Sequence, residues 1–428
     1  MDKSFIKEKL DCGATLIAEK LPNFHSVTAG IWVGTGSVTE TVEENGISHL
    51  IEHMLFKGTK KRSAKQISVD VDNIGGQINA FTSKECTCYY IKVIDKKLEE
   101  GLEILTDLFC NATLDSGELE KEKGVVLEEI AMSNDNPEDV AMDLISSTYF
   151  DGCSLSKTII GPPENIKRFD RDDLLDYMRR YYTASNIVIA VAGNFEEQQL
   201  KDILNRHLTG INQGELFLPA FSDCGGFETA PQFCTLEKDT EQVHLCMGMP
   251  CYNMQDNQRF ALNILNNIVG GSMSSRLFQK IREEMGMAYS VFTYPALYRD
   301  AGMYGVYAGT MAGNADCVTE LILKELMLVK KYGITKQEFL QGKEQLKGSM
   351  ILSLESTSSK MSAIGKAQLL TGSVYSDDEV LAHIDAVKHE EIRDIIDYCI
   401  RPELLTATCV GKGCSKDTLQ KIVEENLK

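Results

Sequence analysis

A stretch of five residues, HLIEH at positions 49–53, constrains this chain more than any other segment. It lies within NGISHLIEHMLFKG, which we interpret as one short helix because Asn45 or Ser48 can cap its start and Gly58 can end it. Residues four apart on a helix lie one turn apart on the same face. The sequence therefore predicts two imidazoles side by side.

This spacing allows the two histidines, His49 and His53, to bind one zinc ion. Glu52 can point toward the same ion without ligating it, and its carboxylate can take a proton from a water on the metal. The order H-x-x-E-H is the reverse of the more common H-E-x-x-H. The alternative is an ordinary helix with two satisfied histidines. Zinc also needs a third protein ligand, and a catalytic site keeps its fourth position for water.

Candidates for a third ligand lie on a helix expected at 115–133. Glu122 and Glu129 are seven residues apart, two helical turns, and so share a face. A charged residue near a buried face is rarely left unpaired. The alternative is the solvated face of an acidic helix, and we assign Glu118 and Glu120 to that face.

Composition limits the class of protein. The chain has 428 residues, enough for two domains, and a net charge of −19 without a basic cluster, which argues against nucleic-acid binding. The negative charge either keeps the protein soluble or forms an acidic surface that attracts cationic ligands. No apolar run approaches a membrane span, and the N-terminus lacks a signal-peptide core. The thirteen cysteines contain no paired C-x-x-C arrangement, so we expect free thiols and a cytoplasmic protein.

Periodicity predicts an α+β chain. Alternating residues at 12–33 indicate strands, and QINAFTS and CTCYYIKVI indicate a hairpin through Lys84-Glu85. Ser63 is a candidate helix cap, and Pro137 a candidate helix start. If the strand from Gln77 to Ser83 lies at a sheet edge, an extended peptide can pair with it, and Asn79, Ala80 and Phe81 would line that site.

The layout repeats after a stretch that is rich in glycine and proline. Residues 391–412 resemble 173–195, and the helix pair at 315–354 resembles that at 95–133. We therefore predict two related domains: a catalytic zinc-binding domain at 1–210, a linker at 211–230 and a non-catalytic repeat domain at 231–428. Where the repeat would place H-x-x-E-H, the second half has FALNILNNIVGG.

Three segments, GISHLIEHMLFKGT, GGQINAFTSKECTCYY and EKEKGVVLEEIAM, resemble the pitrilysin/insulinase family of zinc peptidases. The chain is most similar to the half-length bacterial members, which are themselves similar to mitochondrial processing peptidase. The resemblance implies one Zn²⁺ per chain held by His49, His53 and Glu129, with Glu52 as general base. It also implies that Glu122 supports the site from outside the ligand set.

The resemblance extends to SSRLFQKIREEMGMAYSV, in which Arg282 and Tyr289 match a pair that binds the scissile peptide or its transition state. A helix-end arginine and a packing tyrosine are the alternative. In the family, two half-length units, each with helix-packed and antiparallel-rich sheets, form a clamshell around a closed chamber. This implies a homodimer that hydrolyses short or unfolded peptides.

Two other functions stay open. One is a processing peptidase that removes basic leader segments, which the acidic balance fits weakly. The other is a non-catalytic core subunit of a larger complex, as some relatives are. The intact motif favours the metalloendopeptidase.

Overall fold

The computed structural model describes residues 5–214 and 230–426, which form two compact units. The first contains residues 5–130, 157–214 and 352–376, and the second contains residues 131–156, 230–351 and 377–426. Most of the linker expected at 211–230 lies outside the described residues. Each unit therefore consists mainly of one half of the chain and includes one short segment from the other half.

A six-stranded sheet forms the centre of the first unit, with the order β1-β2-β6-β3-β5-β4. Every neighbouring pair is antiparallel except β2 and β6, which are parallel. The predicted hairpin is confirmed as β4 and β5, and β4 lies at an edge of the sheet. The strands are β1 (Ile6–Lys9), β2 (Thr15–Lys20), β3 (Ser26–Val33), β4 (Gln77–Thr82), β5 (Thr87–Ile94) and β6 (Ile187–Gly193).

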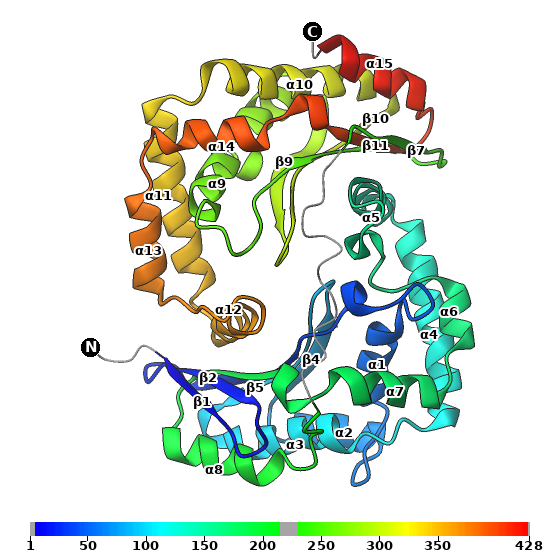
Figure 1. Ribbon diagram of the computed structural model, residues 1–428, viewed down its shortest axis with the longest axis vertical. Helices are drawn as coiled ribbons and strands as arrows, with labels where there is room; N and C mark the ends of the chain where they lie inside the picture. The colour runs from blue at the N-terminus through cyan, green and yellow to red at the C-terminus, as the bar shows by residue number, and fades with distance from the viewer. Residues whose placement is uncertain (1–4, 215–229, 427–428) are drawn as a thin grey trace. The chain divides into compact units, whose positions relative to one another are not determined.

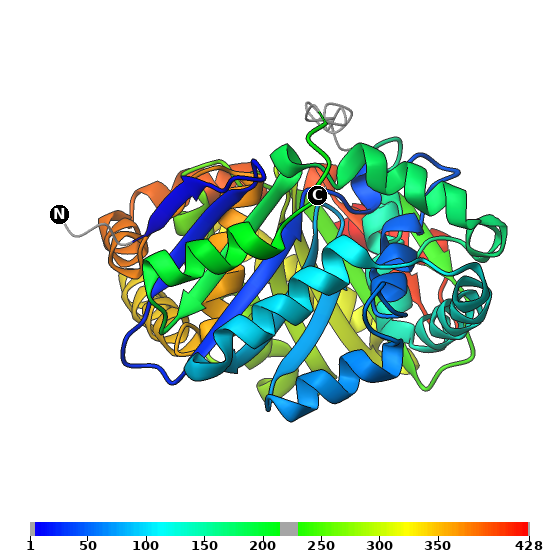
Figure 2. The same cartoon turned by 90° about the horizontal axis from the view of Figure 1, so that it is seen from below.

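Helices cover one face of this sheet and build the main core of the unit. Figure 2 shows α3 and α8 lying across the strands, and both helices contribute buried leucines and isoleucines to the core. Ser63 caps α2 as predicted, since its side chain accepts a hydrogen bond from the backbone N–H of Gln66. The helices are α1 (Ile47–Leu55), α2 (Ala64–Asn73), α3 (Leu98–Asn111), α4 (Ser116–Asp135), α6 (Pro163–Arg168), α7 (Arg171–Tyr181) and α8 (Glu197–His207).

The opposite face is covered by α12 (Thr357–Leu370), a helix from the C-terminal half of the chain (Figure 1). It packs on β2, β3 and β6 in a second apolar cluster around Trp32 and Met361. The indole N–H of Trp32 lies 3.3 Å from the sulfur of Met361, and the hydroxyls of Thr28 and Thr357 are 2.9 Å apart. The first sheet is thus completed by a helix that is remote in sequence.

The second unit is built on a five-stranded sheet with the order β7-β11-β8-β10-β9, in which β7 and β11 are parallel. Here the remote helix is α5 (Pro137–Tyr149), which begins at the predicted proline and packs on β8 and β11. The strands are β7 (Phe233–Leu236), β8 (Gln242–Pro250), β9 (Ala288–Leu297), β10 (Gly302–Met311) and β11 (Thr406–Val410). The remaining helices are α9 (Arg259–Asn266), α10 (Ala315–Tyr332), α11 (Lys336–Ser353), α13 (Asp377–Ala386), α14 (Glu391–Cys399) and α15 (Lys416–Asn426).

The predicted α+β class is confirmed, and the expected repeat is visible in the elements. Helix α7 leads into β6 as α14 leads into β11, and α3 and α4 correspond to α10 and α11. Among residues 5–214 and 230–426, no helix is long and apolar enough to cross a membrane.

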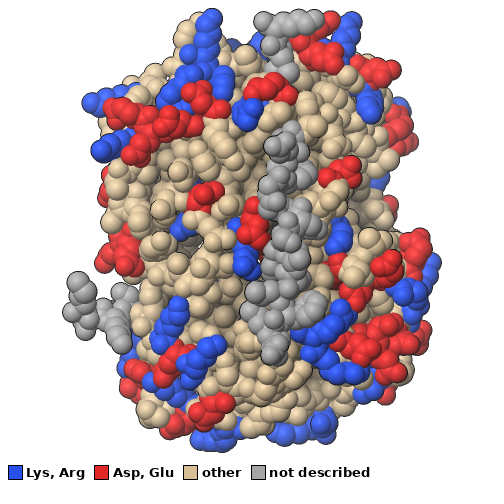
Figure 3. Space-filling model, in the orientation of Figure 1, with Lys and Arg blue, Asp and Glu red and all other residues tan. Residues whose placement is uncertain are grey.

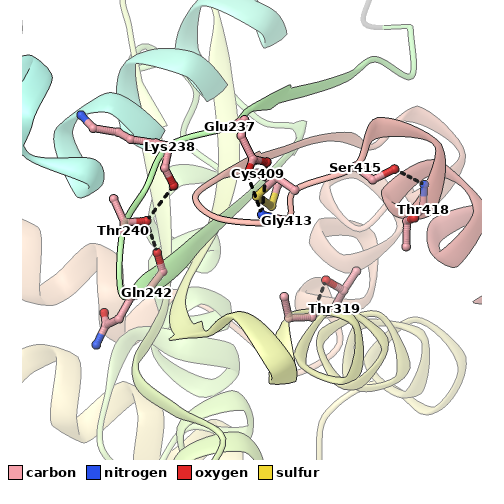
Figure 4. The surroundings of a disulfide bond; sticks show 11 residues. Glu237, Lys238, Thr240, Gln242, Thr319, Cys409, Gly413, Ser415 and Thr418 are labelled. Atoms are coloured by element: carbon pink, nitrogen blue, oxygen red, sulfur yellow. Dashed lines mark hydrogen bonds between the residues drawn. A yellow bond between two sulfur atoms is a disulfide. The ribbon is translucent and has the colours of Figure 1, made fainter.

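The expectation of thirteen free thiols is wrong, because Cys409 and Cys414 form a disulfide (Figure 4). Cys409 is the second-last residue of the buried strand β11, and the turn at 411–415 brings Cys414 back to a Cα–Cα distance of 5.9 Å, which is within bonding range. The carboxylate of Glu237 holds the same turn by accepting the backbone N–H of Gly413 at 3.1 Å. Cys86 and Cys88 are free and buried on one face, as expected for alternate residues of a strand.

The close approach of α12 to the sheet gives a prediction. A Cβ at Gly365 would lie 2.3 Å from Nε1 of Trp32, whose side chain is fully buried and cannot move aside. We expect Gly365→Ala to lower the free energy of unfolding by about 2 kcal/mol, the usual cost of overpacking. Urea unfolding followed by tryptophan fluorescence measures this, since Trp32 is the single tryptophan.

Gly348→Ala is the matched control, because it lies in helix α11 and a Cβ there meets nothing within 4 Å. That change should stabilise the helix by up to about 1 kcal/mol. Equal effects of the two substitutions would contradict the packing that places α12 on this sheet.

Candidate metal centre

Helix α1 carries the H-x-x-E-H stretch and is fixed by its apolar face. Leu50, Ile51 and Met54 are completely buried in the main core of the first unit. The helix ends at Leu55, before the expected stop at Gly58. With this face buried, the two histidines lie at the margin of the core.

The start of α1 is held by Glu40, which the sequence analysis missed. Its carboxylate accepts hydrogen bonds from the backbone N–H groups of Gly46 and Ser48 and from the side-chain amide of Asn45, each at 2.9 Å. The expected caps were wrong, since α1 begins after Gly46 and neither Asn45 nor Ser48 caps it with a side chain. Burial raises the pKa of Glu40, against these hydrogen bonds, which lower it. No local pattern marks an acid that lies well before the helix it caps.

Three side chains of the first unit converge in a geometry that fits zinc. Ligand atoms of His49, His53 and Glu129 all lie within 4.8 Å of one another. Oε2 of Glu129 is 3.4 Å from Nε2 of His53 and 3.8 Å from Nε2 of His49. A tetrahedral ion with bonds of about 2.1 Å separates its ligands by about 3.4 Å. The three residues can therefore hold one zinc ion with little movement.

The two imidazoles differ in their other nitrogen. Nδ1 of His53 is hydrogen-bonded to Oε1 of Glu122 at 2.8 Å, which leaves Nε2 facing Glu129. Nδ1 of His49 is buried, with no hydrogen-bond partner among the described residues. Burial, and then the charge of His53, lower the pKa of His49 to about 4. His49 is thus neutral near pH 7, the form in which histidine binds a metal.

Glu52 lies beside this cluster but outside the ligand set. Its Oε2 accepts a hydrogen bond of 2.5 Å from the hydroxyl of Thr82, at the end of β4. Burial raises the pKa of Glu52, and the bond from Thr82 partly offsets that shift. A raised pKa makes this carboxylate a better proton acceptor, and the same group can later return the proton.

The edge strand β4 ends beside Glu52 and is partly open. Its residues alternate between exposed and half-buried side chains, and Phe81 is 37% exposed. The side chain of Asn79 accepts a hydrogen bond from the backbone N–H of Ala80. Within residues 5–214 and 230–426, β4 is paired with β5 alone, so its other side can present backbone groups to a second strand.

Arg282 and Tyr289 lie together in the second unit. The guanidinium of Arg282 is 4.9 Å from the ring centroid of Tyr289 and 4.7 Å from that of Phe278. Arg282 lies on the π-helix Phe278–Glu284, and Tyr289, which is 74% exposed, lies near the start of β9. The structure thus brings the expected pair into contact with each other.

Two models of known protein families match this chain. Residues 15–163 match the family model described as insulinase (peptidase family M16), and residues 168–346 match the peptidase M16 inactive domain. This chain belongs to the M16 peptidase family. The candidate metal ligands and Glu52 lie within the first match, and the segment FALNILNNIVGG, which lacks H-x-x-E-H, lies within the second.

Bacterial relatives of this M16 protein match over most of their length. YmxG of Bacillus subtilis, named an uncharacterized zinc protease, is 44% identical over 390 residues, which cover 90% of this chain and 92% of that protein. SCO5738 of Streptomyces coelicolor, named likewise, is 36% identical and covers 90% of this chain and 84% of that protein. The predicted family is confirmed, and the chain is a zinc protease by its similarity to these relatives, with a group of residues that could hold the metal.

Solved structures confirm the M16 fold. A protease from Helicobacter pylori has a TM-score of 0.88 at 21% identity, over 95% of this chain and 99% of that one. A chain of Complex III2 from Candida albicans has a TM-score of 0.84 at 19% identity, over 98% and 99%. Both likenesses concern the fold alone.

The Glu40 contacts give a prediction about α1. Glu40→Gln replaces one acceptor oxygen with an amide donor that faces backbone N–H groups, which leaves buried donors unpaired. We expect the free energy of unfolding to fall by about 3 kcal/mol, measured by urea unfolding.

Glu44→Gln serves as the control, because Glu44 and its partner Arg180 are partly exposed, at 21% and 37%, so the loss of this ion pair should cost less than about 1 kcal/mol. Unfolding of both variants at the same urea concentration would exclude Glu40 as the anchor of the helix.

Proposed function

We propose that this M16 zinc protease is an endopeptidase of short or unfolded peptides, with one zinc ion per chain held by His49, His53 and Glu129. The observation that carries the proposal is the spacing of the three ligand atoms, all within 4.8 Å of one another, beside the half-buried carboxyl group of Glu52. A zinc ion bound there polarises a carbonyl and makes a water molecule more acidic.

The residues of the chain supply the proton transfers. Glu52 takes the proton of the attacking water and later delivers it to the leaving amine. The hydroxyl of Thr82 holds Oε2 of Glu52, so the other oxygen of this carboxylate is available to the water. Glu122 supports His53 through Nδ1. These contacts support the assignment of Glu52 as base and of Glu122 as a residue that orients a ligand.

The open side of β4 supports extended peptides as substrates. Backbone groups at Asn79, Ala80 and Phe81 can pair with a peptide strand, which selects an extended conformation more than a sequence. Folded proteins rarely offer such a strand, so short or unfolded chains fit best. On the face drawn in Figure 3, acidic and basic side chains of the described residues are intermixed, which gives no support to a nucleic-acid partner.

The remaining proposals rest on the family resemblance. They are a homodimer, a closed chamber and hydrogen bonds from Arg282 and Tyr289 to the scissile carbonyl or its oxyanion. A cytoplasmic location is supported by nine free cysteines among the described residues, and the disulfide between Cys409 and Cys414 weighs against it.

The central prediction separates the ligands from the base. Replacing His49, His53 or Glu129 with alanine should remove zinc and peptide hydrolysis together. Glu52→Gln should lower kcat by at least about 10³-fold while zinc stays bound, because Glu52 is not a ligand. Metal analysis and an internally quenched peptide assay measure both properties.

Glu128→Gln is the matched control, since Glu128 is the exposed neighbour of Glu129 on α4 and should keep both zinc and activity. Loss of zinc from the Glu52→Gln protein, or full zinc occupancy in Glu129→Ala, would contradict the assignment. A wild-type protein without zinc or turnover would point to a non-catalytic core subunit. Cleavage confined to a single bond after a basic leader would point to a processing peptidase.

The second-unit pair is tested separately. Arg282→Ala and Tyr289→Phe should each lower kcat by about 10²-fold with zinc content unchanged, because each removes a donor to the developing oxyanion. Arg276→Ala is the control, because Arg276 is bound to Glu338 in the same unit. If both the Arg282→Ala and the Tyr289→Phe proteins keep the wild-type kcat, the two residues only pack against each other and do not take part in catalysis.

A further inference from the structure

The buried carboxylate of Glu122 has two partners, one on each oxygen. Oε1 is 2.8 Å from Nδ1 of His53, and Oε2 is 2.7 Å from the ammonium group of Lys57. The side chain of Glu122 is only 5% exposed, and that of Lys57 is 30% exposed. A carboxylate this deeply buried needs both contacts, since each oxygen that loses its partner is left without water to replace it.

The two partners come from one local stretch. Lys57 follows His53 by four residues, and its backbone N–H bonds the carbonyl of Met54 just beyond the end of α1. His53 and Lys57 therefore approach Glu122 from the same turn, and a single carboxylate on α4 bridges them. We propose that Lys57 is a positioning residue of the metal centre, which fixes the side chain of Glu122 and thereby holds His53 with Nε2 toward Glu129.

Other cations near Glu122 are engaged elsewhere. Lys121 is paired with Glu118 and Lys123 with Glu120, each at 2.6 Å. In the part of the chain that the structure describes, Lys57 is the cation on this carboxylate. Without it, Oε2 of Glu122 loses its charged partner, and the carboxylate is free to rotate away from Nδ1 of His53.

A comparison of His49 with His53 shows why the contact of Lys57 with Glu122 matters for His53 alone. Nδ1 of His49 has no hydrogen-bond partner among the described residues, so packing alone sets the angle of that ring. The orientation of His53 depends instead on the bond to Glu122. Outer partners of metal-binding histidines commonly change metal affinity by 10- to 100-fold. Lys57 contacts Glu122 and not the histidine itself, so we expect its effect on metal affinity to lie at the lower end of that range.

This inference rests on the zinc site of the proposed function, and its test uses metal affinity without any peptide. Lys57→Met keeps the length of the stem and removes the charge. We expect it to weaken zinc binding about tenfold, measured by competition with a fluorescent chelator at pH 7.5. Lys57→Arg keeps a cation and should stay within about threefold of the unsubstituted protein.

The sign of the change separates positioning from simple electrostatics. Removing a positive charge near a cation site should tighten zinc binding by Coulomb's law alone, whereas loss of positioning weakens it. Lys123→Met is the matched control, because Lys123 is a buried lysine of α4 that is paired with Glu120 and bonds the carbonyl of Lys167, with no ion pair to Glu122 among the described residues. It should leave zinc affinity unchanged.

A double substitution tests the route through Glu122. If Lys57 acts through that carboxylate, Lys57→Met should add no more than about twofold in a Glu122→Gln background, since effects within one chain of contacts are not additive. Circular dichroism checks that each variant is folded, and Lys57→Gln replaces Lys57→Met if the methionine protein does not fold.

Equal or tighter zinc binding in folded Lys57→Met protein would overturn the inference and leave the proposed function intact. Full additivity with Glu122→Gln would also overturn it. Failure of the unsubstituted protein to bind zinc would overturn both the inference and the proposed function.

Discussion

The burial of one face of α1 is the constraint on which the metal centre depends. Leu50, Ile51 and Met54 are withdrawn from water completely, which stabilises the helix in one rotation about its axis by several kcal/mol. Because helical geometry is fixed, that rotation also decides where the side chains at 49 and 53 point. Hydrophobic packing thus sets the orientation of the helix. The polar contacts of Glu40, Glu122 and Thr82 then hold its start, His53 and Glu52.

The polar contacts come from elements that are remote in sequence. Glu40 precedes α1, Glu122 and Glu129 lie on α4, and Thr82 ends an edge strand. Glu40, Glu122 and Thr82 each form one or two hydrogen bonds with the same short helix, and Oε2 of Glu129 lies 3.4 Å from Nε2 of His53. The hydroxyl that bonds Glu52 thus belongs to an edge strand, which places the proposed general base next to the backbone that we propose binds a peptide.

Sequence reasoning found the features that are written in local patterns. The histidine spacing, the hairpin of β4 and β5, the Ser63 cap and the proline at the start of α5 all depend on neighbours within a few residues. The cap from Glu40 was missed because no spacing rule joins it to α1. The sequence also did not show that α5 packs on the sheet of the second unit and α12 on the sheet of the first. This exchange of helices was missed for a related reason, since amphipathic helices do not reveal which sheet they cover. The disulfide between Cys409 and Cys414 was missed because it depends on the conformation of the turn at 411–415, which the sequence did not show.

The exchange of α5 and α12 has a consequence for how the chain is made. Helix α5 leaves the ribosome early with Ala141, Ile145 and Tyr149 on an apolar face, but its partner strands β8 and β11 follow much later, and β11 near the end of synthesis. Until then that face has no sheet to cover, and the first sheet lacks α12 in the same way. Each sheet therefore waits for a helix or strands from the other half of the chain, and apolar surface stays exposed through much of synthesis, a condition that favours aggregation.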